Sequence, residues 1–260
     1  MLIDTHCHLD FPEFDQDREE VISRAKNEGI GYIVNIGSSL EGSEKALELA
    51  GRYDFIYATV GIHPHEADKF NDKLKVRLEA LVKKDKVSAI GETGLDYYLP
   101  AGQAGKNYSQ AENQKALFVY LVNLAKDSGL PLVIHTRQAQ ADTLKVLKEA
   151  MPVKAVIHCF SGDGDFLKES LDLGFLVSFT CNITYKKAQD LRGIVKLAPL
   201  ERIMLETDAP FLPPEGLRGM RNDPAQVKLL AGEIAHLKET SVAEVARVTT
   251  LNAKDFFRLP

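Results

Sequence analysis

Residues 2–9 read LIDTHCHL, a short apolar stretch in which two histidines stand one residue apart. Seven more stretches of this kind recur along the chain, each rich in Val, Ile or Leu. Such nearly continuous apolar runs are typical of strands that are buried on both faces, as in parallel sheets. The eight expected strands cover residues 2–9, 31–37, 55–63, 86–96, 131–137, 154–162, 175–180 and 202–210.

Segments with helical periodicity separate these strands and follow the last one. Asp223 is expected to cap a helix that has Pro224 at its first position, and the spacing of Ser241 and Glu244 predicts a capping box before a final helix. Eight strands alternating with helices predict a (β/α)8 TIM barrel of the α/β class, a single domain over residues 1–260. A doubly wound open sheet is disfavoured because no GxGxxG turn follows the first strand. The helices before the final one are expected at 15–28, 40–52, 72–84, 108–128, 142–150, 164–173, 185–198 and 224–238.

The composition excludes some classes of protein. No apolar run approaches the ~20 residues of a membrane-spanning helix, and no basic region followed by an apolar core indicates a signal peptide. Three widely spaced cysteines argue against a disulfide framework and for a reducing compartment, so we expect a cytoplasmic protein with no membrane partner. The net charge of −5 speaks against a broad basic surface for nucleic acid, although bound divalent cations would concentrate positive charge locally. Nothing in the sequence indicates an oligomeric state.

Polar residues gather at the carboxyl ends of the expected strands, where a barrel places its functional groups. Six of the seven histidines fall at or just past such an end. His6 and His8 lie two positions apart, so both imidazoles share one face of the first strand and should point into the barrel mouth. Taken alone, this pair fits core packing as well as metal binding. The other polar residues at strand ends are His63, Glu92, Asp96, His135, Arg137, His158, Glu206 and Asp208.

Glu92 ends an otherwise apolar strand, and a carboxylate in that position needs a cation or a hydrogen-bond donor. A salt bridge with Arg137 is one alternative, and a metal ion is the other. His135 and His158 hold matching places on consecutive strands, so they should point at one spot although each alone reads as a core histidine.

Imidazole and carboxylate ligands suit Zn, Mn, Fe, Co or Ni better than Ca. Six ligands exceed the three that a single catalytic Zn normally takes, but they suffice for two metals that share one carboxylate. We therefore expect two divalent metal ions. The expected ligands are His6, His8 and Asp208 for one metal, His135 and His158 for the other, and Glu92 as the bridge.

These residues lie in a series of motifs that runs through the whole chain in order. DTHCHLD, VGIHPH, GETGLDY, PLVIHTR, IHCFSG, LETDAPFL and RGMRNDP together resemble the TatD-type metal-dependent deoxyribonucleases, which are amidohydrolase-like barrels. The resemblance implies a (β/α)8 fold, two divalent metals such as Zn, Mn or Mg, and hydrolysis of phosphodiester bonds in DNA single strands or ends, with exonucleolytic action. Met220 departs from the family pattern, which commonly has Lys there, and this weakens the case for residues 218–221 as a full phosphate clamp.

The expected mechanism uses a water that bridges the two metals, because its pKa is then lowered to roughly 7. Glu92 acts as the bridging ligand and Asp208 as the general base. His63 is expected to hydrogen-bond a phosphate oxygen or to protonate the leaving group, and it also fits a loop-orienting histidine. His65, which follows a proline, is a weaker candidate for substrate binding. Phosphate oxygens are expected to be bound by Arg137, Arg218 and Arg221.

Two other functions compete with this one. An amidohydrolase acting on esters or amides, including aminoacyl-tRNA deacylation, could use the same site. A carboxylated lysine bridges the metals in many such barrels, whereas Glu92 stands in that place here, which favours the nuclease-like branch. A metal-holding, non-catalytic binding module is the third hypothesis, and the complete ligand set argues against it. Tyr97 and Tyr98 either stack on bases or pack a loop.

Overall fold

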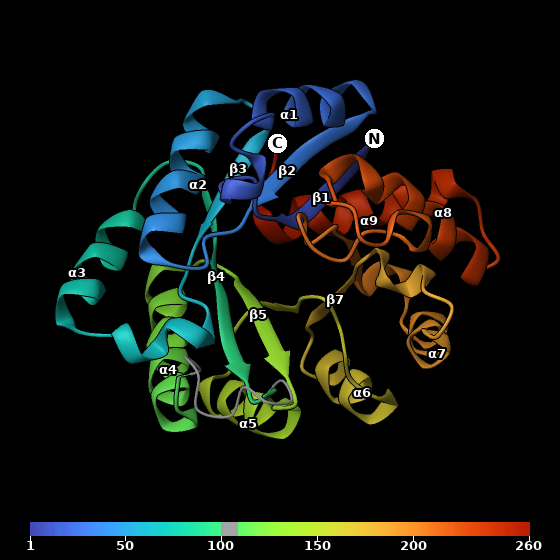
Figure 1. The fold of residues 1–260 in the computed structure, drawn as a ribbon. Coiled ribbons are helices and arrows are strands. Elements are labelled where there is room, and N and C mark those ends of the chain that lie inside the picture. The colour runs from blue at the N-terminus through green and yellow to red at the C-terminus, as the bar shows by residue number, and fades with distance from the viewer. Residues whose placement is uncertain (100–108) are drawn as a thin grey trace.

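The computed structural model describes residues 1–99 and 109–260. Within them, eight parallel strands follow one another around a sheet in the order β1 to β8, each paired with the next, with helices packed outside (Figure 1). The predicted (β/α)8 barrel is thereby confirmed. The strands are β1 Leu2–Cys7, β2 Ile30–Asn35, β3 Ile56–Val60, β4 Val87–Asp96, β5 Leu132–Arg137, β6 Ala155–Ile157, β7 Leu176–Phe179 and β8 Ile203–Leu205.

The barrel closes where the ends of β1 and β8 meet. The Asp208 backbone N–H donates to the His6 carbonyl at 2.8 Å, and the His8 N–H donates to the Ala209 carbonyl at 2.7 Å. Cys7 and Ala209 form a parallel bridge between these two bonds. The closing seam therefore holds the first and last strand ends in register, at the carboxyl end of the barrel.

The helices lie close to the expected ranges, with differences at their first turns. Short 3₁₀ turns stand in the segments that lead into four of them, at Pro12–Phe14, Pro64–Lys69, Cys181–Thr184 and Pro224–Gln226, and three of these turns begin with a proline. The expected start of the fourth helix at residue 108 lies outside the described residues. The helices are α1 Arg18–Asn27, α2 Leu40–Arg52, α3 Asp72–Leu81, α4 Ala111–Ser128, α5 Gln140–Ala150, α6 Gly164–Asp172, α7 Gln189–Leu197, α8 Val227–Leu237 and α9 Val242–Phe257.

Both capping predictions agree with the structure in their main contact. The Asp223 carboxylate accepts from the Ala225 N–H at 2.9 Å, and the Ser241 hydroxyl accepts from the Glu244 N–H at 3.1 Å. The Glu244 side chain, however, pairs with Arg247 instead of returning to the cap residue, because a guanidinium offers two donors one turn away. No described helix is long and apolar enough to cross a membrane.

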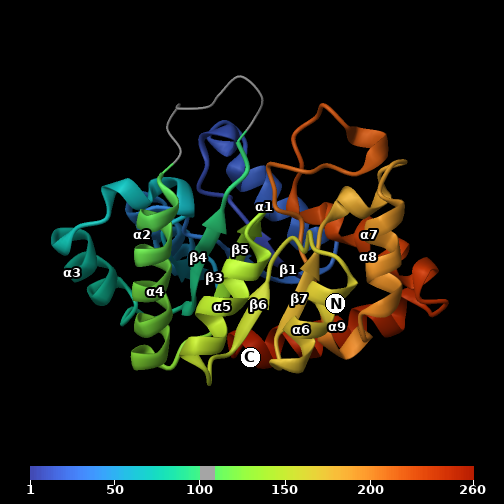
Figure 2. The same ribbon diagram turned by 90° about the horizontal axis from the view of Figure 1, so that it is seen from below.

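The two ends of the barrel differ in what covers them. Figure 2 shows the loops that follow β1 and β8 on one side of the sheet, and α9 with the C-terminus on the other. At the α9 end, strand side chains such as Ile3 and Met204 pack with Phe256 and Phe257 in one buried cluster. Polar side chains at the carboxyl ends of the strands are thus left to face the open mouth.

Candidate metal centre

His6 and His8 lie at the end of β1 and point at the same space. Their Nε2 atoms are 3.3 Å apart, and both residues are buried. The Nδ1 atom of His8 lies 3.2 Å from the carbonyl of Ile36, which can only accept. This contact places the imidazole proton on Nδ1 and leaves the Nε2 lone pair of His8 directed at the mouth.

Asp208 joins this pair from the loop after β8. One of its carboxylate oxygens, Oδ1, lies 3.6 Å from His6 Nε2 and 3.5 Å from His8 Nε2. Asp208 has a φ of 55°, in the left-handed region, so the chain turns sharply there instead of continuing the strand. The β8 ladder ends at Leu205, three residues before this turn and earlier than expected from the sequence.

Glu92, near the end of β4, faces two separate sets of imidazoles. Its Oε1 lies 2.8 Å from His135 Nδ1 and 2.8 Å from His158 Nε2. Its Oε2 lies 3.7 Å from His6 Nε2 and 3.9 Å from His8 Nε2. The two oxygens are therefore divided between the two expected metal positions, which is the arrangement required of a bridging ligand.

The charge state of Glu92 follows from this surrounding. Burial alone would raise the pKa of the carboxyl group, but attraction to His158 and His63 and hydrogen bonds from His135 outweigh it and hold the pKa well below its usual range. The carboxylate is thus ionised at neutral pH, as a metal ligand must be. Arg137, the alternative partner considered for Glu92, instead lies with its guanidinium carbon 3.7 Å from the ring centroid of Tyr98.

The donor set fits divalent cations. His135 Nδ1 and His158 Nε2 are 3.2 Å apart, the same kind of approach as between the two nitrogens on β1. In each pair, at most one nitrogen can donate a hydrogen bond to the other. The nitrogens that carry no proton direct their lone pairs into the space between the rings, where a cation could bind them. Within the described residues, four groups bring three possible ligand atoms close enough together for one ion: His6–His8–Asp208, His6–His158–Glu206, His63–Glu92–His135 and His63–His65–Asp96.

A second layer of polar groups lies around His135 and His63. Asp96 is buried, and its Oδ2 lies 3.3 Å from His135 Nε2 and 3.0 Å from His65 Nε2. Burial lowers the pKa of His63 to about 3, so this imidazole is neutral at physiological pH. Its Nδ1 accepts from the backbone N–H of His65 at 3.2 Å, which leaves the ring proton on Nε2. The sequence placed Asp96 at a strand end but gave it no role.

Glu206 is the other residue whose part in the site was missed. It is buried and accepts hydrogen bonds from the Cys159 backbone N–H at 2.6 Å and from the Ser178 hydroxyl at 2.7 Å. Its oxygens face His158 Nδ1 at 3.5 Å and His6 Nδ1 at 3.9 Å, on the side of each ring away from the mouth. Its place at the end of the eighth expected strand was the available signal, because a barrel brings its strand ends together.

The predicted phosphate-binding residues are not all near the centre. A cavity of about 960 Å³ opens above it, and the described residues that line it include His63, His65 and Arg137 but neither Arg218 nor Arg221. Arg221 forms a two-point ion pair with Asp17 at 2.6 and 2.8 Å.

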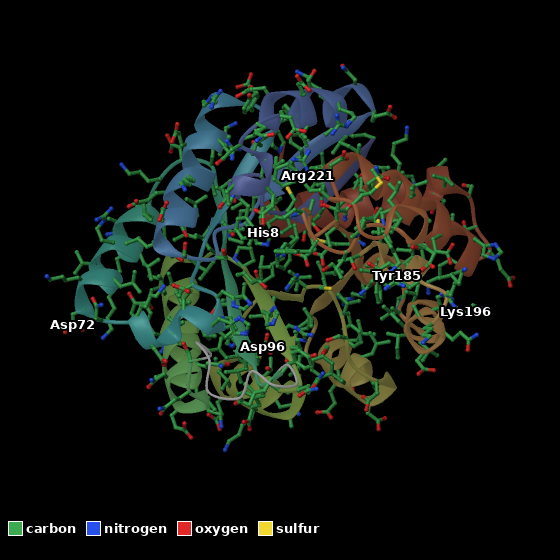
Figure 3. The ribbon with its side chains drawn as sticks, viewed as in Figure 1. His8, Asp72, Asp96, Tyr185, Lys196 and Arg221 are labelled. Atoms are coloured by element: carbon green, nitrogen blue, oxygen red, sulfur yellow. The ribbon has the colours of Figure 1, made fainter. Side chains whose placement is uncertain are left out.

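Arg218 lies 4.8 Å from the ring of Tyr185. In the view of Figure 3, Arg221 lies on the α1 side of His8, and Tyr185 lies toward α7. Within the described chain, Arg137 is therefore the predicted arginine that reaches the cavity.

A (β/α)8 barrel with imidazoles and carboxylates gathered at its carboxyl mouth defines a class of metal-dependent hydrolases. The profile of the family described as TatD related DNase matches residues 3–258. The chain therefore belongs to the TatD related DNase family, and it is a metal-dependent hydrolase.

Individual relatives agree with this assignment. The chain is 41% identical to the uncharacterized metal-dependent hydrolase YabD of Bacillus subtilis over 100% of both chains. It is 33% identical to the 3'-5' ssDNA/RNA exonuclease TatD of Cronobacter sakazakii over 98% of this chain and 97% of the relative. The crystal structure of YJJV, a TatD homolog from Escherichia coli K12, superimposes with a TM-score of 0.91 at 32% identity, covering 100% of this chain and 98% of that one.

Proposed function

We propose that this protein removes nucleotides from the ends of single-stranded DNA by hydrolysing phosphodiester bonds, with two divalent metal ions held at the barrel mouth. The observation that carries the proposal is the division of the two Glu92 oxygens between two imidazole sets. The name of the Cronobacter sakazakii relative, an exonuclease on single-stranded DNA and RNA, supports the choice of substrate.

In this proposal, His6, His8 and Asp208 would hold one ion, His135 and His158 would hold the other, and Glu92 would be shared between them. Bound divalent ions lower the pKa of water and neutralise charge on the phosphate. The Glu206 carboxylate faces Nδ1 of His158 at 3.5 Å and Nδ1 of His6 at 3.9 Å, and its charge favours a proton on these atoms, with the Nε2 lone pairs of both rings toward the mouth.

The remaining steps use side chains of the cavity. Asp208, whose oxygen already lies among the β1 imidazoles, accepts the proton of the attacking water. His63 is neutral and carries its proton on Nε2, so it acts as a hydrogen-bond donor to a non-bridging phosphate oxygen. Because the imidazolium form of His63 is scarcely populated at neutral pH, His63 does not protonate the leaving group, whose oxygen takes its proton from water in the open mouth. Arg137 binds the next phosphate along the strand from the cavity edge.

The experiment that tests this function combines metal removal with a panel of substrates. The chelator-treated protein, reloaded with Mn²⁺, Zn²⁺ or Mg²⁺, is assayed on 5'- and 3'-labelled single-stranded oligonucleotides, on an aryl ester and on aminoacyl-tRNA. We expect metal-dependent release of mononucleotides and little turnover of the other two. Turnover confined to the ester or the aminoacyl-tRNA would overturn the proposal in favour of the amidohydrolase alternative.

A further inference from the structure

The structure points to a nucleobase-binding site, and we propose that Phe211, backed by Phe11, stacks on the base at the end of the substrate strand. Both rings line the cavity above the metal centre. Phe211 is 47% exposed. The other large apolar side chains that are exposed within residues 1–99 and 109–260 are aliphatic or methionine. The inference rests on the proposed function, because it names the part of a nucleic-acid substrate that this side of the mouth would recognise.

The two phenylalanines form a continuous aromatic path to the metal centre. The Phe11 ring is stacked on the His8 ring, with centroids 4.6 Å apart and planes 25° apart. Phe211 meets Phe11 edge to face at 6.0 Å and lies 6.3 Å from His8. A base and its own phosphate are separated by one sugar, so a nucleotide with its phosphate at His8 can place its base against Phe211.

The loop that presents Phe211 is tightly fixed. The buried side chain of Asn222 donates to the carbonyls of Thr207 at 3.0 Å and Phe211 at 2.8 Å, and the Phe211 N–H donates to the Asp208 carbonyl at 2.8 Å. Leu212, the next residue, has a φ of 51° in the left-handed region. These bonds fix the backbone on both sides of an apolar ring that remains exposed, so the exposure is built into the loop.

An unpaired base is the occupant that this geometry favours. Aromatic side chains that stack bases are a general feature of proteins that bind single strands, and every base offers a face for stacking. The platform is small, one exposed ring backed by a second, and it adjoins the site proposed to hold the phosphate. A stacked base requires a single-stranded or frayed end, which agrees with a substrate that is not fully paired.

Cleavage of matched substrates by matched variants tests this site. The substrates are a single-stranded oligonucleotide and the same oligonucleotide whose terminal nucleotide lacks its base. The variants are Phe211→Ala, Phe211→Trp and the control Leu229→Ala, which removes a similarly exposed apolar side chain on α8. We expect Phe211→Ala to raise KM about 10-fold for the substrate that keeps its terminal base and to leave KM for the other substrate unchanged. Phe211→Trp, which keeps an aromatic ring, should have the wild-type KM. Equal cleavage of both substrates by the wild type, or an equal loss of kcat on both in Phe211→Ala, would overturn the proposal.

A binding measurement separates this inference from the proposed function. Metal-loaded protein is titrated with dAMP and with 2-deoxyribose 5-phosphate, which lacks the base. We expect dAMP to bind about 10-fold more tightly and Phe211→Ala to remove that advantage while binding of the sugar phosphate is unchanged. Equal affinities in the wild type would contradict the stacking site even if oligonucleotides are cleaved. A preference for dAMP without oligonucleotide cleavage would support the base site and reject the nuclease.

Discussion

The same strands form both ends of the barrel, but the buried side chains are apolar at one end and polar at the other. At the amino end, Ile3 of β1 and Met204 of β8 pack against Phe256 of α9, and this contact is wholly apolar. At the carboxyl end, β1 continues into His6, which is just as deeply buried, and β4 brings Glu92 beside it. Burial at one end removes apolar surface from water, whereas burial at the other raises the cost of every uncompensated polar atom.

The comparison teaches where stability and chemistry are located in this fold. At the apolar end, burial of the protein's own side chains stabilises the folded state, and no bound ion is needed. The polar end places nitrogens 3.2 and 3.3 Å apart around carboxylates, a set that is most favourable when cations lie among them. We therefore expect substitutions at the two ends to separate: those at the mouth change activity and metal binding, and those at the α9 end change the free energy of unfolding.

The largest effect is expected from Glu92→Gln. An amide keeps the shape of the side chain but removes the charge that faces both imidazole sets, so kcat/KM on single-stranded DNA should fall by at least about 10³-fold. Circular dichroism should show an intact fold. Glu149→Gln, an exposed carboxylate on α5, is the matched control and should keep full activity. Activity within tenfold of wild type in Glu92→Gln would show that this carboxylate is not central.

Phe256→Ala tests the other end of the barrel. Removing this fully buried ring should lower the free energy of unfolding by about 3–5 kcal/mol, through lost burial and the cavity left behind. The kcat of the molecules that remain folded should stay near wild type because the ring is distant from the mouth. Chemical denaturation followed by fluorescence or circular dichroism measures the change. Leu251→Ala, an exposed position on the same helix, should cost less than about 0.5 kcal/mol.

The sequence could predict the barrel and the residues that converge at its mouth, because both depend on periodicity. Apolar runs such as 131–137 mark buried strands, and a barrel brings all strand ends together, so His135 could be expected near Glu92. The strand ends themselves were less predictable. Cys159 and Asp208 have φ values of 44° and 55°, and the β6 and β8 ladders already end before these turns, at Ile157 and Leu205.

Side-chain partners that come from distant strands could not be predicted from spacing. Glu206 takes its donors from the loop after β6 and from β7, and it faces an imidazole on β1; only the closed barrel brings these together. The same holds for Arg221, whose partner Asp17 lies 204 residues earlier in the chain. A motif can identify an arginine near a mouth, but the direction of its side chain depends on which carboxylate the fold places beside it.

Glu206→Gln addresses the layer behind the metal centre. Glutamine keeps an acceptor for the Cys159 N–H but loses the charge that faces His6 and His158, so metal affinity should fall about 10- to 100-fold with the fold retained. Calorimetric titration of the chelator-treated protein with Mn²⁺ measures this directly. At saturating metal, kcat should recover most of its wild-type value. Unchanged affinity, or a loss of activity that metal does not restore, would contradict a positioning role.

The smallest effects are expected from the arginines, of which Arg137 lines the cavity and Arg221 does not. Arg137 lines the cavity while held on Tyr98, so Arg137→Ala should raise KM for an oligonucleotide about 10-fold with little change in kcat. Arg221 is already paired with Asp17, so Arg221→Ala should leave KM within about twofold and lower the free energy of unfolding by at most about 1 kcal/mol. A rise in KM for Arg221→Ala that Asp17→Asn does not share would mean that Arg221 leaves its ion pair to bind the substrate, and the predicted phosphate clamp would then extend to this loop.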